Sequence, residues 1–172
     1  MTTFRILFFY FIVYSFLGWI IEGLFNLSKN GKFTKPNFLK LPLKPMYGFA
    51  STLLVMLAPL IPMWLFVPLC FIIPSFIEYL SAYLLDKFLD LRYWNYEHKS
   101  YQFHGYVCLE FSCYWLLLSL LLIFFVQPYI LTLYMLVAKA WGFVAAFIFL
   151  IVLWDFVTTL LKNTHRCKNM LS

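Results

Sequence analysis

The chain of 172 residues is 64% hydrophobic and only 12% charged, whereas soluble domains are usually about 45–50% apolar and about 25% charged. This composition excludes an ordinary water-soluble fold. Because a helix needs about 20 apolar residues to cross the hydrocarbon core of a bilayer, the long uncharged runs predict an all-α, polytopic membrane helix bundle. Helices of this kind leave only modest connections, so we expect one integral membrane domain over residues 1–172 and no soluble catalytic or nucleotide-binding domain.

The first apolar run predicts a membrane span over residues 4–25. Its only charges are Arg5 and Glu22, and no small-residue cleavage site follows it, so we expect an uncleaved span rather than a signal peptide. Residues 26–44 are rich in proline and lysine, which favours an extended surface connector over a helix. The lysines of this connector are Lys29, Lys32, Lys35, Lys40 and Lys44.

Residues 45–85 form a second apolar run, in which Glu78 is the only charge. A single helix of that length would measure roughly 60 Å, about twice the thickness of the hydrocarbon core. We therefore expect two spans, at residues 46–61 and 64–88, separated at Pro59 and Pro62. Pro68 and Pro74 fall inside the second of these spans and predict a kink there.

The remaining sequence predicts two more spans, at residues 105–126 and 135–158, with an interruption at Pro128. Residues 86–104 form a polar connector that also carries tyrosine and tryptophan side chains. These side chains favour the membrane interface, so this connector is expected to lie against the headgroups. The chain is thus expected to have about five transmembrane helices.

Positive charge predicts the orientation, because cytoplasmic connectors are enriched in lysine and arginine. With the N-terminus outside, eleven of the thirteen basic residues lie inside and only Arg5 and Lys139 lie outside. We therefore expect an N-outside, C-inside protein of an inner or plasma membrane whose inner face attracts anionic lipid headgroups, with no role in nucleic-acid binding. The inner residues are Lys29, Lys32, Lys35, Lys40, Lys44, Lys87, Arg92, Lys99, Lys162, Arg166 and Lys168.

Three carboxylates, Glu22, Glu78 and Glu110, fall within or at the ends of the predicted spans. A carboxylate at the centre of a bilayer costs at least about 2.5–3.5 kcal/mol, so each should face protein or water and have a partner. The pattern predicts a cytoplasm-facing polar cavity for a cationic or zwitterionic group, or a proton relay. The alternative is that the acids only pair with nearby bases and hold the bundle together. The bases expected at the rim are Lys40, Lys44, Arg92, His98 and His104.

Other chemistry finds little support in the sequence. His98 and His104 do not belong to a His-Glu-x-x-His arrangement, so we expect no metal site. The four cysteines, Cys70, Cys108, Cys113 and Cys167, contain no Cys-x-x-Cys pair and are expected to be free thiols. The chain has no glycine-rich phosphate-binding loop, and we expect it to hold no cofactor and not to bind ATP itself.

Four short segments resemble the bacterial CmpB-type family, which is classed with ABC-transporter permeases. They are YSFLGWIIE at residues 14–22, PMYGF at 45–49, the Glu78-Tyr79 pair, and YWNY at 93–96 followed by Gly105. The resemblance extends over about residues 8–130 and implies a permease served by a separate ATPase, for which residues 91–103 are a candidate docking surface. The positions that match the family pattern are Glu22, Tyr47, Gly48, Glu78, Trp94, Tyr96 and Gly105.

Three functions remain open at this point. The first is a permease-like transporter subunit with a polar cavity that also includes Tyr47, Trp94 and Tyr96; a chain this small would need an oligomer or a second subunit. The second is a small intramembrane enzyme acting on a lipid headgroup, with a glutamate, His98 or His104 as general base. In that case the phosphate would be held by Lys40, Lys44 and Arg92. The third is a non-catalytic partner of another membrane protein, which would use helix faces rich in small residues as interfaces.

Overall fold

The computed structural model describes residues 2–34 and 36–171, and the side chains of residues 3–34 and 36–164. Among these residues, three helices are long and apolar enough to cross a membrane, at Thr3–Asn30, Met63–Leu89 and Leu109–Thr164, and a shorter apolar helix lies at Pro45–Leu57. The architecture is that of an all-α helical membrane protein. Some of the predictions above fall outside this description: those for Lys35 and for the side chains of Arg166 and Lys168 at the inner face, and that of a free thiol at Cys167.

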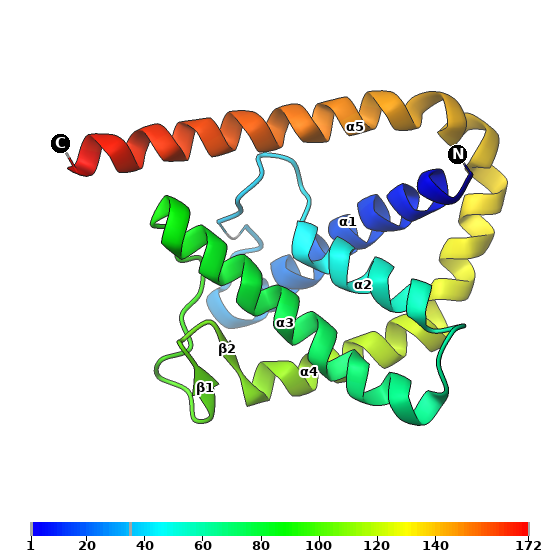
Figure 1. Cartoon of the computed structure of the whole chain (residues 1–172), viewed down its shortest axis with the longest axis horizontal. Coiled ribbons are helices and arrows are strands. Elements are labelled where there is room, and N and C mark those ends of the chain that lie inside the picture. Colours follow the sequence, from blue (N-terminus) through cyan, green and yellow to red (C-terminus); the bar gives the residue numbers. More distant parts are fainter. Residues whose placement is uncertain (1, 35, 172) are drawn as a thin grey trace.

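The elements run back and forth between two ends of the molecule (Figure 1). One end, here called the hairpin end, holds the end of α3, the hairpin β1–β2 and the C-terminal part of α5. The opposite end holds the start of α1, the turn between α2 and α3, and η1. In chain order the elements are α1 (Thr2–Asn30), α2 (Pro45–Leu57), α3 (Met63–Leu89), β1 (Gln102–Phe103), β2 (Val107–Cys108), α4 (Leu109–Leu121), the π-helical turn η1 (Leu122–Val126) and α5 (Gln127–Leu171).

The helix boundaries of the first half follow the proline positions. Helix α2 ends at Leu57, four residues before the predicted end of its span, and α3 begins after Pro62, which is its N-cap. Proline is well suited to such boundaries because its φ angle is fixed and it has no amide hydrogen. Pro68 and Pro74 remain inside α3 and do not end it.

The second half differs more from the sequence-based boundaries. Gly105, the expected first residue of the fourth span, lies in the hairpin, and the helix begins only at Leu109. Pro128 does not end the helix, which continues through η1 into α5. The π-helical turn ends at Val126, two residues before Pro128. Proline has no amide hydrogen to donate to the preceding turn, and the π-helical turn changes the hydrogen-bonding pattern at this point of the helix. Figure 1 shows that α5 bends and returns beside α1, so the change in direction occurs within a helix.

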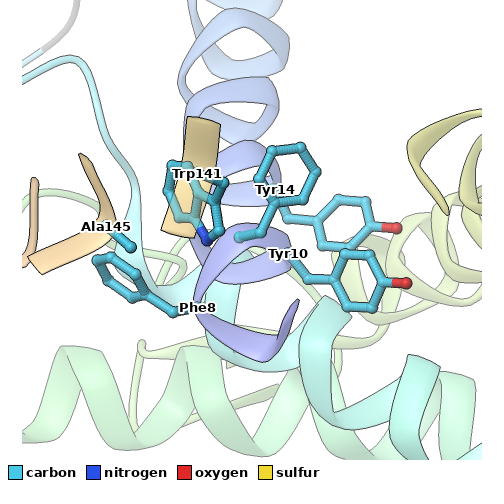
Figure 2. Packing of buried hydrophobic residues seen from close by; sticks show 6 residues of the cluster. Phe8, Tyr10, Tyr14, Trp141 and Ala145 are labelled. Atoms are coloured by element: carbon cyan, nitrogen blue, oxygen red, sulfur yellow. The ribbon is translucent and has the colours of Figure 1, made fainter. Parts of the chain in front are cut away.

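An aromatic cluster joins α5 to α1 where α5 returns. Figure 2 shows Trp141 and Ala145 of α5 against the α1 residue Phe8, with the Tyr10 and Tyr14 hydroxyls both directed away from Ala145. The Trp141 indole donates a hydrogen bond of 2.9 Å to the carbonyl oxygen of Arg5, and the Tyr14 hydroxyl donates to the Gln127 side chain. Two polar contacts and one buried aromatic cluster therefore hold the returning helix in place.

Two glycines let α1 and α2 approach closely. A Cβ atom at Gly18 would overlap the ring of Tyr47, and one at Gly48 would overlap the Ser15 hydroxyl and lie 2.7 Å from the Phe11 carbonyl oxygen. Both helices therefore need glycine at these positions, as is common where membrane helices pack tightly. This contact explains why the segments 14–22 and 45–49 carry matching glycines.

We predict that Gly18→Leu destabilises the protein by about 1–3 kcal/mol or more, because the added side chain must displace the ring of Tyr47. Thermal unfolding of the detergent-solubilised protein, followed by size-exclusion chromatography, measures this effect. Gly31→Asn is the control: Gly31 has a φ of +67° with open space around its Cα, and asparagine tolerates that conformation. Equal unfolding temperatures for the two variants would contradict the packing argument.

Candidate functional site

Glu22 and Lys44 form a buried ion pair between α1 and the start of α2. The Lys44 Nζ lies 2.9 Å from the Glu22 Oε2, and the two side chains are only 9% and 13% exposed. The Lys44 backbone amide also donates to the Ser15 carbonyl oxygen at 2.9 Å, which fixes the lysine against α1. Separating these two charges would be costly, because a buried charge that loses its partner is strongly destabilising.

Glu78 lies in the middle part of α3 and is only 3% exposed. Each of its carboxylate oxygens accepts a hydrogen bond: the Tyr96 hydroxyl lies 3.0 Å from Oε1, and the Trp115 indole nitrogen lies 2.8 Å from Oε2. Tyr96 belongs to the connector after α3, and Trp115 belongs to α4. The buried carboxylate therefore ties three parts of the chain together, as the cost of an unpaired acid in hydrocarbon requires.

Tyr47 lies between α1 and α4. Its ring lies against Gly18, where a Cβ atom would overlap it, and packs on Trp115 with ring centroids 4.7 Å apart. Trp115 in turn donates to Glu78. The resulting group is called the carboxylate cluster below. Its members are Glu22, Lys44, Tyr47, Glu78, Tyr96 and Trp115. Trp115 was not among the predicted site residues, although a polar indole N–H within an apolar span indicates that a buried acceptor lies nearby.

The hairpin positions Tyr96. The Tyr96 backbone amide donates to the Gly105 carbonyl oxygen at 2.9 Å, and the Trp94 indole donates to the Tyr106 carbonyl oxygen at 2.9 Å. Gly105 has a φ of +70°, and a Cβ atom there would lie 2.9 Å from Asn95 Oδ1, so glycine is favoured on both counts. The family-pattern residues of this segment thus hold the tyrosine that bonds to Glu78.

Arg92 organises an exposed charge network at the hairpin end. Its guanidinium lies 2.7 Å from Asp86 Oδ2 and 3.2 Å from Glu97 Oε1. The hydrogen bond to Asp86, followed by the charge of Asp86, raises the pKa of Arg92, while hydrogen bonds from Asn95 and then Arg92 lower the pKa of Glu97. These exposed pairs order the connector and contribute little to stability because water screens them.

Glu110 lies apart from Glu22 and Glu78. It is exposed in the first turn of α4 and pairs with Lys99 at 2.8 Å; the hydrogen bond to Glu110 is the main cause that raises the pKa of Lys99. A carboxylate at this position also interacts favourably with the helix dipole. The structure therefore brings together only two of the three carboxylates expected to line one cavity.

The remaining predicted rim residues are exposed and do not meet at one point. His104 lies 3.0 Å from the Tyr79 hydroxyl through its Nδ1 atom, while His98 and Lys40 lie at the surface. Within the described part of the chain, no group of three His, Cys, Asp or Glu side chains could hold a metal ion. Cys70, Cys108 and Cys113 are free thiols.

A third buried carboxylate, Asp155 on α5, was missed by the sequence analysis. It is 6% exposed, and its Oδ2 accepts a hydrogen bond of 2.9 Å from the Leu41 backbone amide. Asp155 could have been found from the sequence, because it is an acid within the predicted fifth span. As for Glu22 and Glu78, the cost of an acid in the bilayer predicts that it faces protein and has a partner. It fastens the connector that carries Lys44 to α5.

A cavity of about 430 Å³ lies between α2, α3, α5 and the two connectors. Its lining is mainly apolar and includes no carboxylate; of the predicted site residues it includes only Lys44 and Trp94. A second cavity of about 80 Å³ is lined in part by Tyr47 and Trp115. In this structure Glu22 is engaged in its ion pair and Glu78 in two hydrogen bonds, and neither lines the larger cavity.

Buried charges held between long apolar helices define the class: a polytopic membrane protein with a charged interior. A family model described as "Putative ABC-transporter type IV" matches residues 9–160. The chain belongs to this family, which confirms the resemblance noted in its sequence. The comparisons with curated proteins and with solved structures gave no match.

We predict that Lys44→Met destabilises the protein by about 3–5 kcal/mol, because the buried Glu22 loses its cationic partner. The double variant with Glu22→Gln should recover much of this loss, since it leaves no uncompensated charge. Thermal unfolding of the wild type, the two single variants and the double variant in detergent measures the coupling between the two residues. Additive effects of the two substitutions would contradict a tight ion pair.

Proposed function

We propose that the chain is a permease-like subunit of a membrane transporter, and that the carboxylate cluster binds a cationic or zwitterionic group of the transported ligand. The observation that carries this proposal is the buried Glu22–Lys44 pair beside Glu78. Charged side chains in membrane segments are costly, and they commonly mark substrate or proton pathways. In the described arrangement the Lys44 ammonium occupies the place that a ligand cation would take.

The family supports the transporter assignment, and the charged side chains at the hairpin end support a docking site for a partner there. Members of an ABC-transporter family work with a separate ATPase, which would dock on the cytoplasmic face. The charged side chains around Arg92 and the Lys99–Glu110 pair lie at the hairpin end, on the connector after α3 and at the start of α4. The same connector carries Tyr96, which bonds to Glu78. Movement of an ATPase docked on this surface would therefore be transmitted to the carboxylate cluster.

The proposed topology has five spans, with the N-terminus outside and the hairpin end in the cytoplasm. The spans are α1, α2, α3, α4 together with η1, and the part of α5 after its bend. Helix α2 has only 13 residues, but the segment before it is buried at Leu39, Leu43 and Lys44. Irregular backbone is tolerated at membrane depth where protein covers it, so this segment completes the second crossing.

The topology predicts opposite accessibility of two engineered cysteines in a variant without the four natural ones. We expect Lys32→Cys to react with a membrane-impermeant maleimide only after the cells are opened, because positive charge retains this connector in the cytoplasm. Leu60→Cys, in the exposed turn between α2 and α3, should react in intact cells. Labelling of residue 32 in intact cells would overturn the orientation.

The transporter proposal is tested by isolating the tagged chain gently from its own membrane. Mass spectrometry identifies co-purifying subunits, and ATP hydrolysis is measured for the wild type, Glu78→Gln and the control Lys139→Gln. We expect an ATPase to co-purify with all three proteins, and hydrolysis to fall at least about tenfold only in Glu78→Gln, because that variant alone changes the carboxylate cluster. Lys139 is exposed on α5, outside both the cluster and the charged surface at the hairpin end, and should tolerate the change.

Two results would contradict this function. Isolation of the chain without any ATPase would argue against an ABC-type assembly, and a chemical change in a co-purified lipid would favour the intramembrane enzyme instead.

The non-catalytic partner is a second candidate because the carboxylates are internally paired and do not line the larger cavity. It predicts that Glu78→Gln alters the amount of co-purifying membrane subunit and leaves ATP hydrolysis per complex unchanged.

A further inference from the structure

The cavity of about 430 Å³ is large enough for part of an amphipathic molecule, since ligand sites typically measure about 300–1,000 Å³. Its walls come from α2, α3, α5 and the two connectors at the hairpin end. The apolar side chains predominate: Phe38, Pro45, Met46, Phe49, Leu84, Leu85, Phe88, Leu89, Phe156 and Leu160. The chemistry of these walls suits a hydrocarbon chain.

The polar side chains of the lining are largely engaged elsewhere. The Asn37 amide donates to the carbonyl oxygens of Leu41 and Leu43 at 3.1 and 2.9 Å. Lys44 pairs with Glu22 on the other side of the connector. A charged or strongly polar ligand would find few partners inside this space and would lose its hydration there.

The cavity is reached from the side of the helices. Phe49 on α2 and Phe88 on α3 line it and are both exposed, as is Phe156 on α5. In a membrane protein, exposed apolar side chains on spanning helices face the hydrocarbon of the bilayer rather than water. The molecule that meets this opening is therefore a membrane lipid.

The outer level of the cavity carries the aromatic pair Tyr93 and Trp94. Tyrosine and tryptophan prefer the depth of the headgroups, so these residues mark where a headgroup would lie while the chain extends inward along α3. One wall is also held firmly: the rings of Phe38 and Phe156 lie 5.7 Å apart, and Leu41 is hydrogen-bonded to Asp155. A preformed site of this kind needs little reorganisation to accept a ligand.

We propose that this cavity binds one acyl chain of a membrane phospholipid, entering between α3 and α5 from the leaflet at the hairpin end, with the headgroup beside Tyr93 and Trp94. The lipid lies against the connector that carries Lys44, and so contributes to the position of the carboxylate cluster. The proposal does not depend on transport, because it requires only that the helices lie in a bilayer.

The test uses the full chain in phosphatidylglycerol vesicles that contain a phosphatidylglycerol with a photoreactive group on one acyl chain. After irradiation, mass spectrometry locates the attached lipid. We expect attachment to residues 37–49 and 81–94 in the wild type, and a decrease of at least about fivefold at both segments in Leu84→Trp, because the indole fills the cavity.

Leu80→Trp is the matched control. Leu80 and Leu84 lie one turn apart on α3 and are 40% and 43% exposed, but only Leu84 lines the cavity. We expect Leu80→Trp to retain the wild-type attachment. Ser81→Phe adds bulk to the same α3 wall of the cavity, three residues before Leu84, and serves as a second test if Leu84→Trp fails to fold, as judged by size-exclusion chromatography.

Equal attachment in the cavity variants and in Leu80→Trp would overturn the proposal. So would attachment confined to exposed α5 side chains outside the cavity, such as Phe143 and Phe147, since that pattern indicates only general contact with the bilayer. Because photolabelling requires no ATPase and no substrate, a negative result here is distinct from a failure of the proposed transporter function.

Discussion

The fold depends on the requirement that every charge carried into an apolar interior find a partner. Glu22 meets Lys44 at 2.9 Å, and Glu78 accepts hydrogen bonds from Tyr96 and Trp115. These contacts join α1 to α2 and α3 to α4, so satisfying the charges also arranges the helices. Hydrophobic burial alone could not do this inside a bilayer, where lipid is as apolar as the helix surfaces.

The short motifs gain a common physical meaning in this arrangement. Gly18 and Gly48 allow α1 and α2 to come together, and that approach places the Tyr47 ring on Trp115, which donates to Glu78. Gly105 closes the hairpin whose backbone holds Tyr96. Segments that lie far apart in the sequence thus build a single cluster, and substitution at any one of these glycines should disturb residues from several helices.

Much of this architecture could be predicted from the sequence, because hydropathy and helix length depend on local composition. The long apolar helices and the separation at Pro62 follow from such local rules. The passage of the helix through Pro128 could not be predicted, since it depends on a π-helical turn. Hydropathy also could not predict that Glu78 is buried and Glu110 exposed, because both are acids near apolar segments. Glu110 stays at the surface because the segment that carries the hairpin brings Lys99 beside it.

The connector at residues 36–44 links the separate parts of the site. Lys44 at its end pairs with Glu22, Leu41 in its middle is bonded to Asp155 of α5, and Phe38 near its start borders the apolar cavity. A shift of this connector would therefore change the ion pair and the cavity together. Because the same segment packs against α5 and α1, binding of an acyl chain in the cavity, as proposed above, would act on the Glu22–Lys44 pair through this connector, and any such coupling would be reciprocal.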